Sequence, residues 1–146
     1  MPSQVRSVNI TAPHYLLERF MDTPWFHEFM RGFEARLHGS AADAVEAHLE
    51  NLANPSIKAL MVAALFERLN QPVVVVCPDP QTAVKYEFEL KQFLSENIER
   101  YPAEDFSPYD LSVFPVQALK SQYEILKRLE KQESFILLVS AKNLLL

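Results

Sequence analysis

The chain has 146 residues, of which 49% are hydrophobic and 23% are charged, a composition that suits one globular domain with a buried core. Its formal net charge of -5 argues against a surface that mainly neutralises phosphates, because nonspecific nucleic-acid binding depends on clustered lysine and arginine. No segment has the pattern of a secretion signal, and the apolar runs fall short of the roughly 20 residues of a membrane span, so we expect a cytoplasmic protein that does not contact membranes.

The amino-terminal part of the chain is predicted to be helical after a loose arm. Residues 1–12 show no periodic apolar face, so we expect a flexible arm there. The apolar residues that follow Pro13 indicate a short helix. Thr23 and Pro24 then give the cap and first-turn signals of a second helix, which we expect to run to about His38.

The second of these helices carries a wide aromatic face. Its large apolar residues recur at spacings of three and four, as they do on one side of an α-helix. The residues are Trp25, Phe26, Phe29, Met30, Phe33 and Leu37. Two hypotheses stay open for this face: it packs against the domain's own sheet, or it docks another domain or subunit.

Two more helices are expected before the first strand. The segment from Ala41 to Leu52 is predicted to be a helix with Ser40 as its cap, and Asn54-Pro55 ends it. Ser56 is expected to cap the next helix, whose apolar face ends at Asn70-Gln71-Pro72.

The residues from Val73 to Cys77 predict a strand of a parallel sheet. The run is mostly β-branched and has no polar alternation, which is typical of a strand covered on both faces, so we expect it to be central. Cys77 is the single cysteine; it cannot form an internal disulfide and is expected to be buried. A helix from Asp79-Pro80 to about Leu94 and a short strand from Ile98 to Tyr101 complete a β-α-β unit.

The last third of the chain repeats the pattern of helix and strand. The segment from Pro102 to Pro115 contains three prolines, which predicts an ordered crossing loop. A helix from Val116 to about Lys131 and a buried strand from Phe135 to Val139 follow.

This order of elements predicts an α/β fold. Alternation of helices with buried strands indicates a three-layer parallel sheet flanked by helices, with right-handed crossovers and extra helices at the amino terminus. We expect a single domain over residues 13–146, in which residues 13–54 form a helical lead-in and residues 55–146 a βα core.

The turn from Leu52 to Ala59 lies where a phosphate-binding loop would open a helix. Lys58 stands at the position of the P-loop lysine, but Leu52 and Ile57 fill both glycine positions, which obstructs close approach of the backbone to a phosphate. Pro55 removes a donor N–H, and Ala59 replaces the serine or threonine that would hold Mg²⁺. The turn therefore predicts a degenerate P-loop, and we expect no cofactor.

Other catalytic or metal-binding patterns are missing from the sequence. The four histidines have no partner at metal-ligand spacing, so no metal site is expected. The carboxylates are spaced as ordinary surface pairs of helices, and no G-x-S-x-G elbow occurs. We expect a chain without a catalytic site of its own.

Several segments resemble the amino-terminal module of the bacterial transcription-repair coupling factor. The similarity has no gap across one helix and the strand after it, and it continues through a proline-rich loop, a helix and a final strand. The similar segments are Lys58 to Leu69, Pro72 to Asp79, Tyr101-Pro102 followed by Pro108-Tyr109-Asp110, Tyr123 to Leu129, and Phe135 to Ser140. Leu16-Leu17 and Thr23 to Phe26 resemble the family's opening pattern, whereas residues 33–54 are longer than the family's usual connection.

The resemblance implies a non-catalytic scaffold with a degenerate RecA-like fold, similar to the first domain of the repair protein UvrB. Proteins of this family are ATP-dependent DNA translocases that remove stalled RNA polymerase and recruit nucleotide-excision repair. The implied partners are UvrA, RNA polymerase and other domains of the same chain, with DNA held by other parts. The family's UvrA contacts lie mainly in a domain that would follow Leu146, so no residue here inherits that role.

Two alternatives remain open beside the resemblance. The first is a nucleotide-binding domain that uses an atypical loop with Lys58. The second is an unrelated α/β domain that binds proteins. Because the chain ends on the apolar run from Leu144 to Leu146, we also expect a fragment of a longer multidomain protein.

Overall fold

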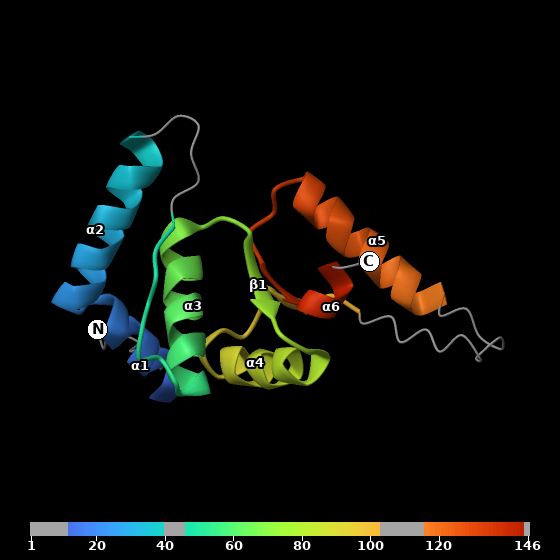
Figure 1. The fold of residues 1–146 in the computed structure, drawn as a ribbon, viewed down its shortest axis with the longest axis horizontal. Helices are drawn as coiled ribbons and strands as arrows, with labels where there is room; N and C mark the ends of the chain where they lie inside the picture. Colours follow the sequence, from blue (N-terminus) through green and yellow to red (C-terminus); the bar gives the residue numbers. More distant parts are fainter. Residues whose placement is uncertain (1–11, 40–45, 103–115, 145–146) are drawn as a thin grey trace, which may run out of the picture. The chain divides into compact units, whose positions relative to one another are not determined.

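The computed structural model describes residues 12–39, 46–102 and 116–144. The chain divides into two compact units, Met1–Leu52 and Ala53–Leu146. Figure 1 shows the described helices and strands in chain order. The expected arm lies outside the described residues except for its last residue, and the expected proline-rich crossing loop does so except for its first.

The first unit contains α1 (Ala12–Met21) and α2 (Pro24–Gly39), so both predicted helices are confirmed. Thr23 separates them as expected. Its hydroxyl donates to the Phe20 carbonyl at 2.7 Å and accepts the Phe26 N–H at 3.3 Å. The cap therefore ends one helix and begins the next.

The helix expected between Ala41 and Leu52 is wrong over residues 46–52, which form no helix. Residues 46–50 are exposed, so the segment has no buried apolar face that would stabilise a helix. Asn51 has a φ of 64°, in the left-handed region that helices do not use. The earlier part of the expected helix, residues 41–45, lies outside the described residues.

The second unit opens with α3 (Pro55–Leu69), one of the predicted helices. Its cap is Asn54 rather than Ser56: the Asn54 side chain accepts the Ser56 N–H at 2.9 Å, and Pro55 occupies the first turn. The Ser56 hydroxyl instead donates to Glu89 at 2.9 Å. The helix ends where expected, at Asn70 in the left-handed conformation.

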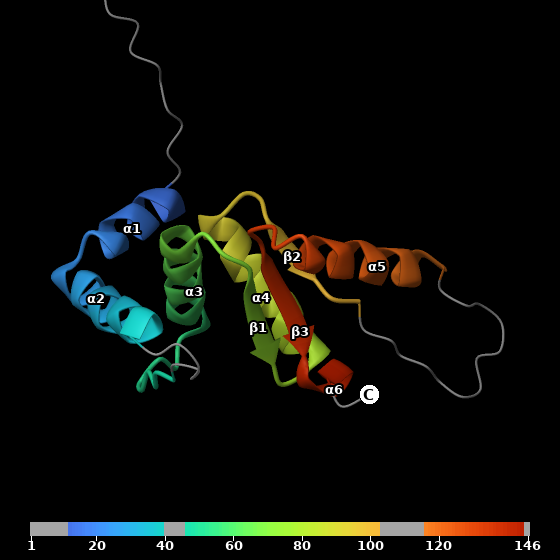
Figure 2. The ribbon, with the colours of Figure 1, turned by 90° about the horizontal axis from the view of Figure 1, so that it is seen from above.

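The sheet is parallel and has the order β1-β3-β2 in the described residues. Its strands are β1 (Val73–Cys77), β2 (Ile98–Arg100) and β3 (Ile136–Ser140). The expectation that the first strand is central is wrong: β3 lies between the other two, and Figure 2 shows β1 beside β3. All five residues of β3 are buried, whereas the first four residues of β1 alternate between partly buried and exposed.

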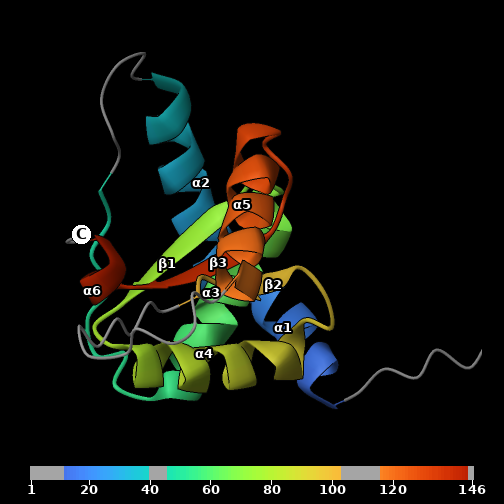
Figure 3. The same ribbon diagram turned by 90° about the vertical axis from the view of Figure 1, so that its right-hand side faces the viewer.

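Helices cover the sheet from both sides. Figure 3 shows α4 (Pro80–Phe93) and α5 (Val116–Glu130) on opposite faces of the sheet. The short helix α6 (Ala141–Leu144), which the sequence did not predict, follows β3 directly. A small parallel sheet with helices on each face confirms the α/β class at this level.

Candidate functional site

The first turn of α3 is capped by the side chain of Asn54. Because Asn54 takes the Ser56 N–H and Pro55 has none, the first turn has fewer N–H groups to offer an anion. Ile57 and Lys58 are exposed on the helix surface. Ala59 is fully buried, so the position of the magnesium-binding hydroxyl is occupied by a methyl group in the core.

Leu52 is the last residue of the first unit, whereas α3 belongs to the second unit. Leu52 is partly buried, and no strand leads from residues 46–52 into α3. A P-loop needs that strand, because the loop is held between the strand and the helix it opens. The turn therefore differs from a phosphate site in both its side chains and its surroundings.

The aromatic face of α2 divides between buried and exposed side chains. Phe26 and Met30 are buried, whereas Trp25 is 51% exposed. Trp25 stacks on Phe29, with ring centroids 5.6 Å apart and an interplanar angle of 11°. Phe29 in turn stacks on Phe33 at 6.0 Å. The stacked rings form a ladder of partly exposed aromatic surface along α2.

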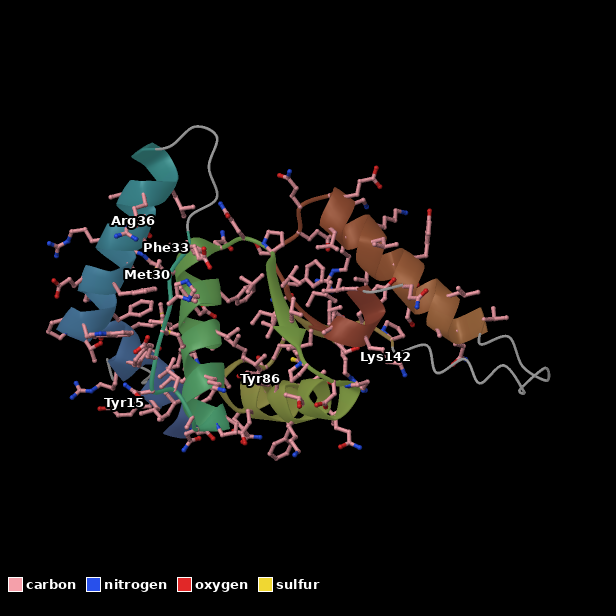
Figure 4. The ribbon with its side chains drawn as sticks, in the orientation of Figure 1. Tyr15, Met30, Phe33, Arg36, Tyr86 and Lys142 are labelled. Atoms are coloured by element: carbon pink, nitrogen blue, oxygen red, sulfur yellow. The ribbon has the colours of Figure 1, made fainter. Side chains whose placement is uncertain are left out.

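A cavity of about 280 Å³ lies beside this ladder, within the first unit. It is lined by Trp25, Glu28, Phe29, Gly32, Phe33, Arg36 and Ala47. Figure 4 labels Phe33 and Arg36, which project from α2. The cavity combines aromatic rings with one acidic and one basic side chain.

Three titratable groups lie near the carboxyl end of β1. Hydrogen bonds from the Thr82 backbone and hydroxyl lower the pKa of Asp79, which caps α4. Burial, and then the charge of Asp79, raise the pKa of the Cys77 thiol. Burial, and then the Cys77 charge, raise the pKa of Tyr86. The thiol is therefore protonated at neutral pH and is a poor nucleophile.

The sequence did not predict that one side of β1 is uncovered. Val74 is 50% exposed and Val76 is 54% exposed. Their register partners on β3 are Leu137 and Val139, and side chains paired in register lie on the same face of a sheet. Ile125 of α5 packs on these β3 residues. The helix thus covers the β3 part of this face and leaves the β1 part open.

The side of α5 that lies opposite Arg128 is also apolar. Arg128 contacts Glu99 of β2 at 3.2 Å, so the Arg128 side of the helix faces β2. The opposite side carries Leu119, Tyr123 and Leu126, which are exposed. At about 100° per residue these three lie well around the helix from Arg128. We call Val74, Val76, Leu119, Tyr123 and Leu126 the β1-α5 apolar surface.

On the Arg128 side of α5 lies a polar cluster whose arginines are paired with carboxylates. Arg128 bonds Glu99 at 3.2 Å and Glu133 at 2.9 Å, and its guanidinium lies 4.3 Å from the centre of the Phe135 ring. Arg100 pairs with Glu87 at 2.8 Å. A cavity of about 200 Å³ lies here. Its arginines already have carboxylate partners: the Arg128–Glu99 pair ties α5 to β2, and the Arg100–Glu87 pair ties β2 to α4.

The described residues contain neither a candidate metal site nor a candidate membrane span. Among the described residues, no three His, Cys, Asp or Glu side chains gather where they could hold a metal ion. None of the described helices has the length and apolar character needed to cross a membrane. No family model, no curated protein and no solved structure matches this chain.

Proposed function

We propose that this chain is a non-catalytic interaction module of a transcription-repair coupling protein. The observation that carries the proposal is the β1-α5 apolar surface. Strands of parallel sheets are normally covered on both faces, and an exposed apolar patch of this kind marks a site of protein contact. Its occupant in this proposal is another domain of the parent protein.

The disabled turn at α3 supports the non-catalytic part of the proposal. A RecA-like nucleotide site needs free N–H groups, glycines and a hydroxyl at this turn, whereas here Asn54 caps the helix and Ala59 is buried. We infer a degenerate RecA-like fold similar to the first domain of UvrB. In this scheme, contacts with UvrA, RNA polymerase and DNA belong to other parts of a cytoplasmic parent protein.

Nucleotide binding separates this proposal from an α/β nucleotide-binding domain with an atypical loop. In calorimetric titration of the chain with ATP and Mg²⁺, we expect no saturable heat up to millimolar nucleotide, and no change on Lys58→Ala. Saturable binding that Lys58→Ala abolishes would favour the nucleotide-binding alternative and refute the non-catalytic assignment.

The repair role needs a cellular measurement. When the gene is disrupted and the cells are irradiated with ultraviolet light, we expect the transcribed strand to lose its faster repair while the other strand is repaired as before. The comparison is made by counting lesions on each strand over time. Undiminished strand bias would leave the chain as an α/β interaction domain unrelated to transcription-coupled repair.

A further inference from the structure

Three residues four positions apart form one line along α2. Glu28, Gly32 and Arg36 follow one another with a rotation of only about 40° per step, because four residues make slightly more than one helical turn. Glu28 and Arg36 therefore lie about 6 Å along the helix axis on either side of Gly32. All three line the cavity of the first unit, and all three are exposed.

Gly32 leaves a gap between the side chains of Glu28 and Arg36, because glycine has no side chain. A Cβ atom added at Gly32 would meet no atom within 4 Å, so there is room for a side chain above the backbone, and Ala47 lines the same cavity. The stacked rings of Trp25, Phe29 and Phe33 lie along the same side of the helix. A second helix can approach closely at a glycine and contact aromatic surface beside it.

The charges of Glu28 and Arg36 indicate which partner fits this surface. We propose that α2 of a second copy of this chain docks here in antiparallel orientation, with a two-fold axis at Gly32. The axis places Glu28 of each copy opposite Arg36 of the other, because both residues are four positions from Gly32. A parallel arrangement would oppose like charges. The same surface is thus complementary to itself, as a two-fold symmetric interface requires.

The expected dimer is weak. One helix from each copy buries less than the roughly 1,600 Å² of a standard stable complex. We therefore expect a dissociation constant on the order of tens of micromolar. Sedimentation equilibrium of the complete chain over that concentration range should show a monomer-dimer equilibrium. A chain that remains monomeric at about 1 mM would overturn the proposal.

Filling the centre of the interface should block the dimer. Gly32→Leu adds a side chain where the two helices meet, and we expect the dissociation constant to rise at least about tenfold. Helix content should be retained, since glycine is a poor helix former, and circular dichroism checks this. His27→Leu adds the same side chain at an exposed site on another side of α2 and should leave the dimer unchanged. A dimer that persists in Gly32→Leu contradicts the geometry.

Charge reversal tests the antiparallel pairing directly. Glu28→Arg and Arg36→Glu should each weaken the dimer about tenfold, because each places two like-charge pairs in the symmetric interface. The double variant Glu28→Arg/Arg36→Glu restores the complementarity and should return the dissociation constant to within about threefold of the original. Arg31→Glu, an exposed reversal off this line, is the matched control. If the double variant is as weak as the single ones, the proposed pairing is wrong.

The single tryptophan supplies a second readout. Trp25 is half exposed in one copy, and the dimer should bury it further. We expect its emission to shift to shorter wavelength, and its quenching by acrylamide to fall, over the same concentrations at which the mass doubles. Both changes should be absent in Gly32→Leu. A concentration-independent spectrum would place the association elsewhere.

Discussion

Replacement of Phe135 by alanine is expected to lower the free energy of unfolding by about 3–5 kcal/mol. Phe135 has no exposed surface and packs in the cluster that joins α5 to β3. Its ring also lies under the guanidinium of Arg128 at 4.3 Å. The substitution removes both the apolar contacts and the cation-π interaction, and it leaves a cavity at the helix-sheet contact. Urea unfolding followed by circular dichroism measures the loss.

Two further variants separate burial from other effects of the substitution. Phe135→Leu keeps most of the apolar volume but loses the ring below Arg128, so we expect a loss of about 1–2 kcal/mol. Phe88→Ala makes the same change as Phe135→Ala at a side chain that is 65% exposed, and it should change stability by about 0.5 kcal/mol or less. Equal losses at Phe135 and Phe88 would refute the packing described for α5.

The starts of three helices were the most predictable part of the fold. Each of three helices begins with a capping residue followed by proline, and the cap and the proline act within one turn of chain. Thr23-Pro24, Asn54-Pro55 and Asp79-Pro80 mark these starts. For α3 we expected Ser56 as the cap, two residues after the actual cap Asn54, because serine is also a good capping residue. These signals are local, so the sequence reveals them without knowledge of the fold.

The position of each strand in the sheet was not predictable in the same way. Four consecutive valines and Cys77 predict a buried strand, but they do not say which strands will be its neighbours. In the structure β3, which comes last in the chain, takes the central place. The helix expected over 41–52 failed for a related reason in residues 46–52: residues 46–50 are exposed, so no buried face stabilises a helix there.

The two candidate sites also differ in how far the sequence alone predicts them. The missing glycines and the missing hydroxyl between Leu52 and Ala59 are visible in the sequence itself, and the degenerate P-loop that they indicate stays a prediction. The β1-α5 apolar surface could not be predicted, because it depends on where α5 crosses the sheet. The sequence of α5 does contain a hint, since apolar residues occupy two sides of the helix and only one side, with Ile125 and Leu129, packs against the core.

The two valines that face each other across β1 and β3 provide the sharpest test of this sheet. Val76 and Val139 are register partners, but Val139 is buried and Val76 is 54% exposed. We expect Val139→Ala to lower the free energy of unfolding by about 2 kcal/mol, from two lost buried carbons and a residual cavity. Val76→Ala should cost about 0.5 kcal/mol or less, because little burial is lost at that site.

Urea unfolding of both variants gives the comparison, and each substitution serves as the control for the other. Equal losses would mean that β1 is as well covered as β3, which would remove the β1-α5 apolar surface and with it the main support for an interaction module. If the proposed partner domain covers Val76, then Val76→Ala should become costly in that complex, where the same side chain is buried.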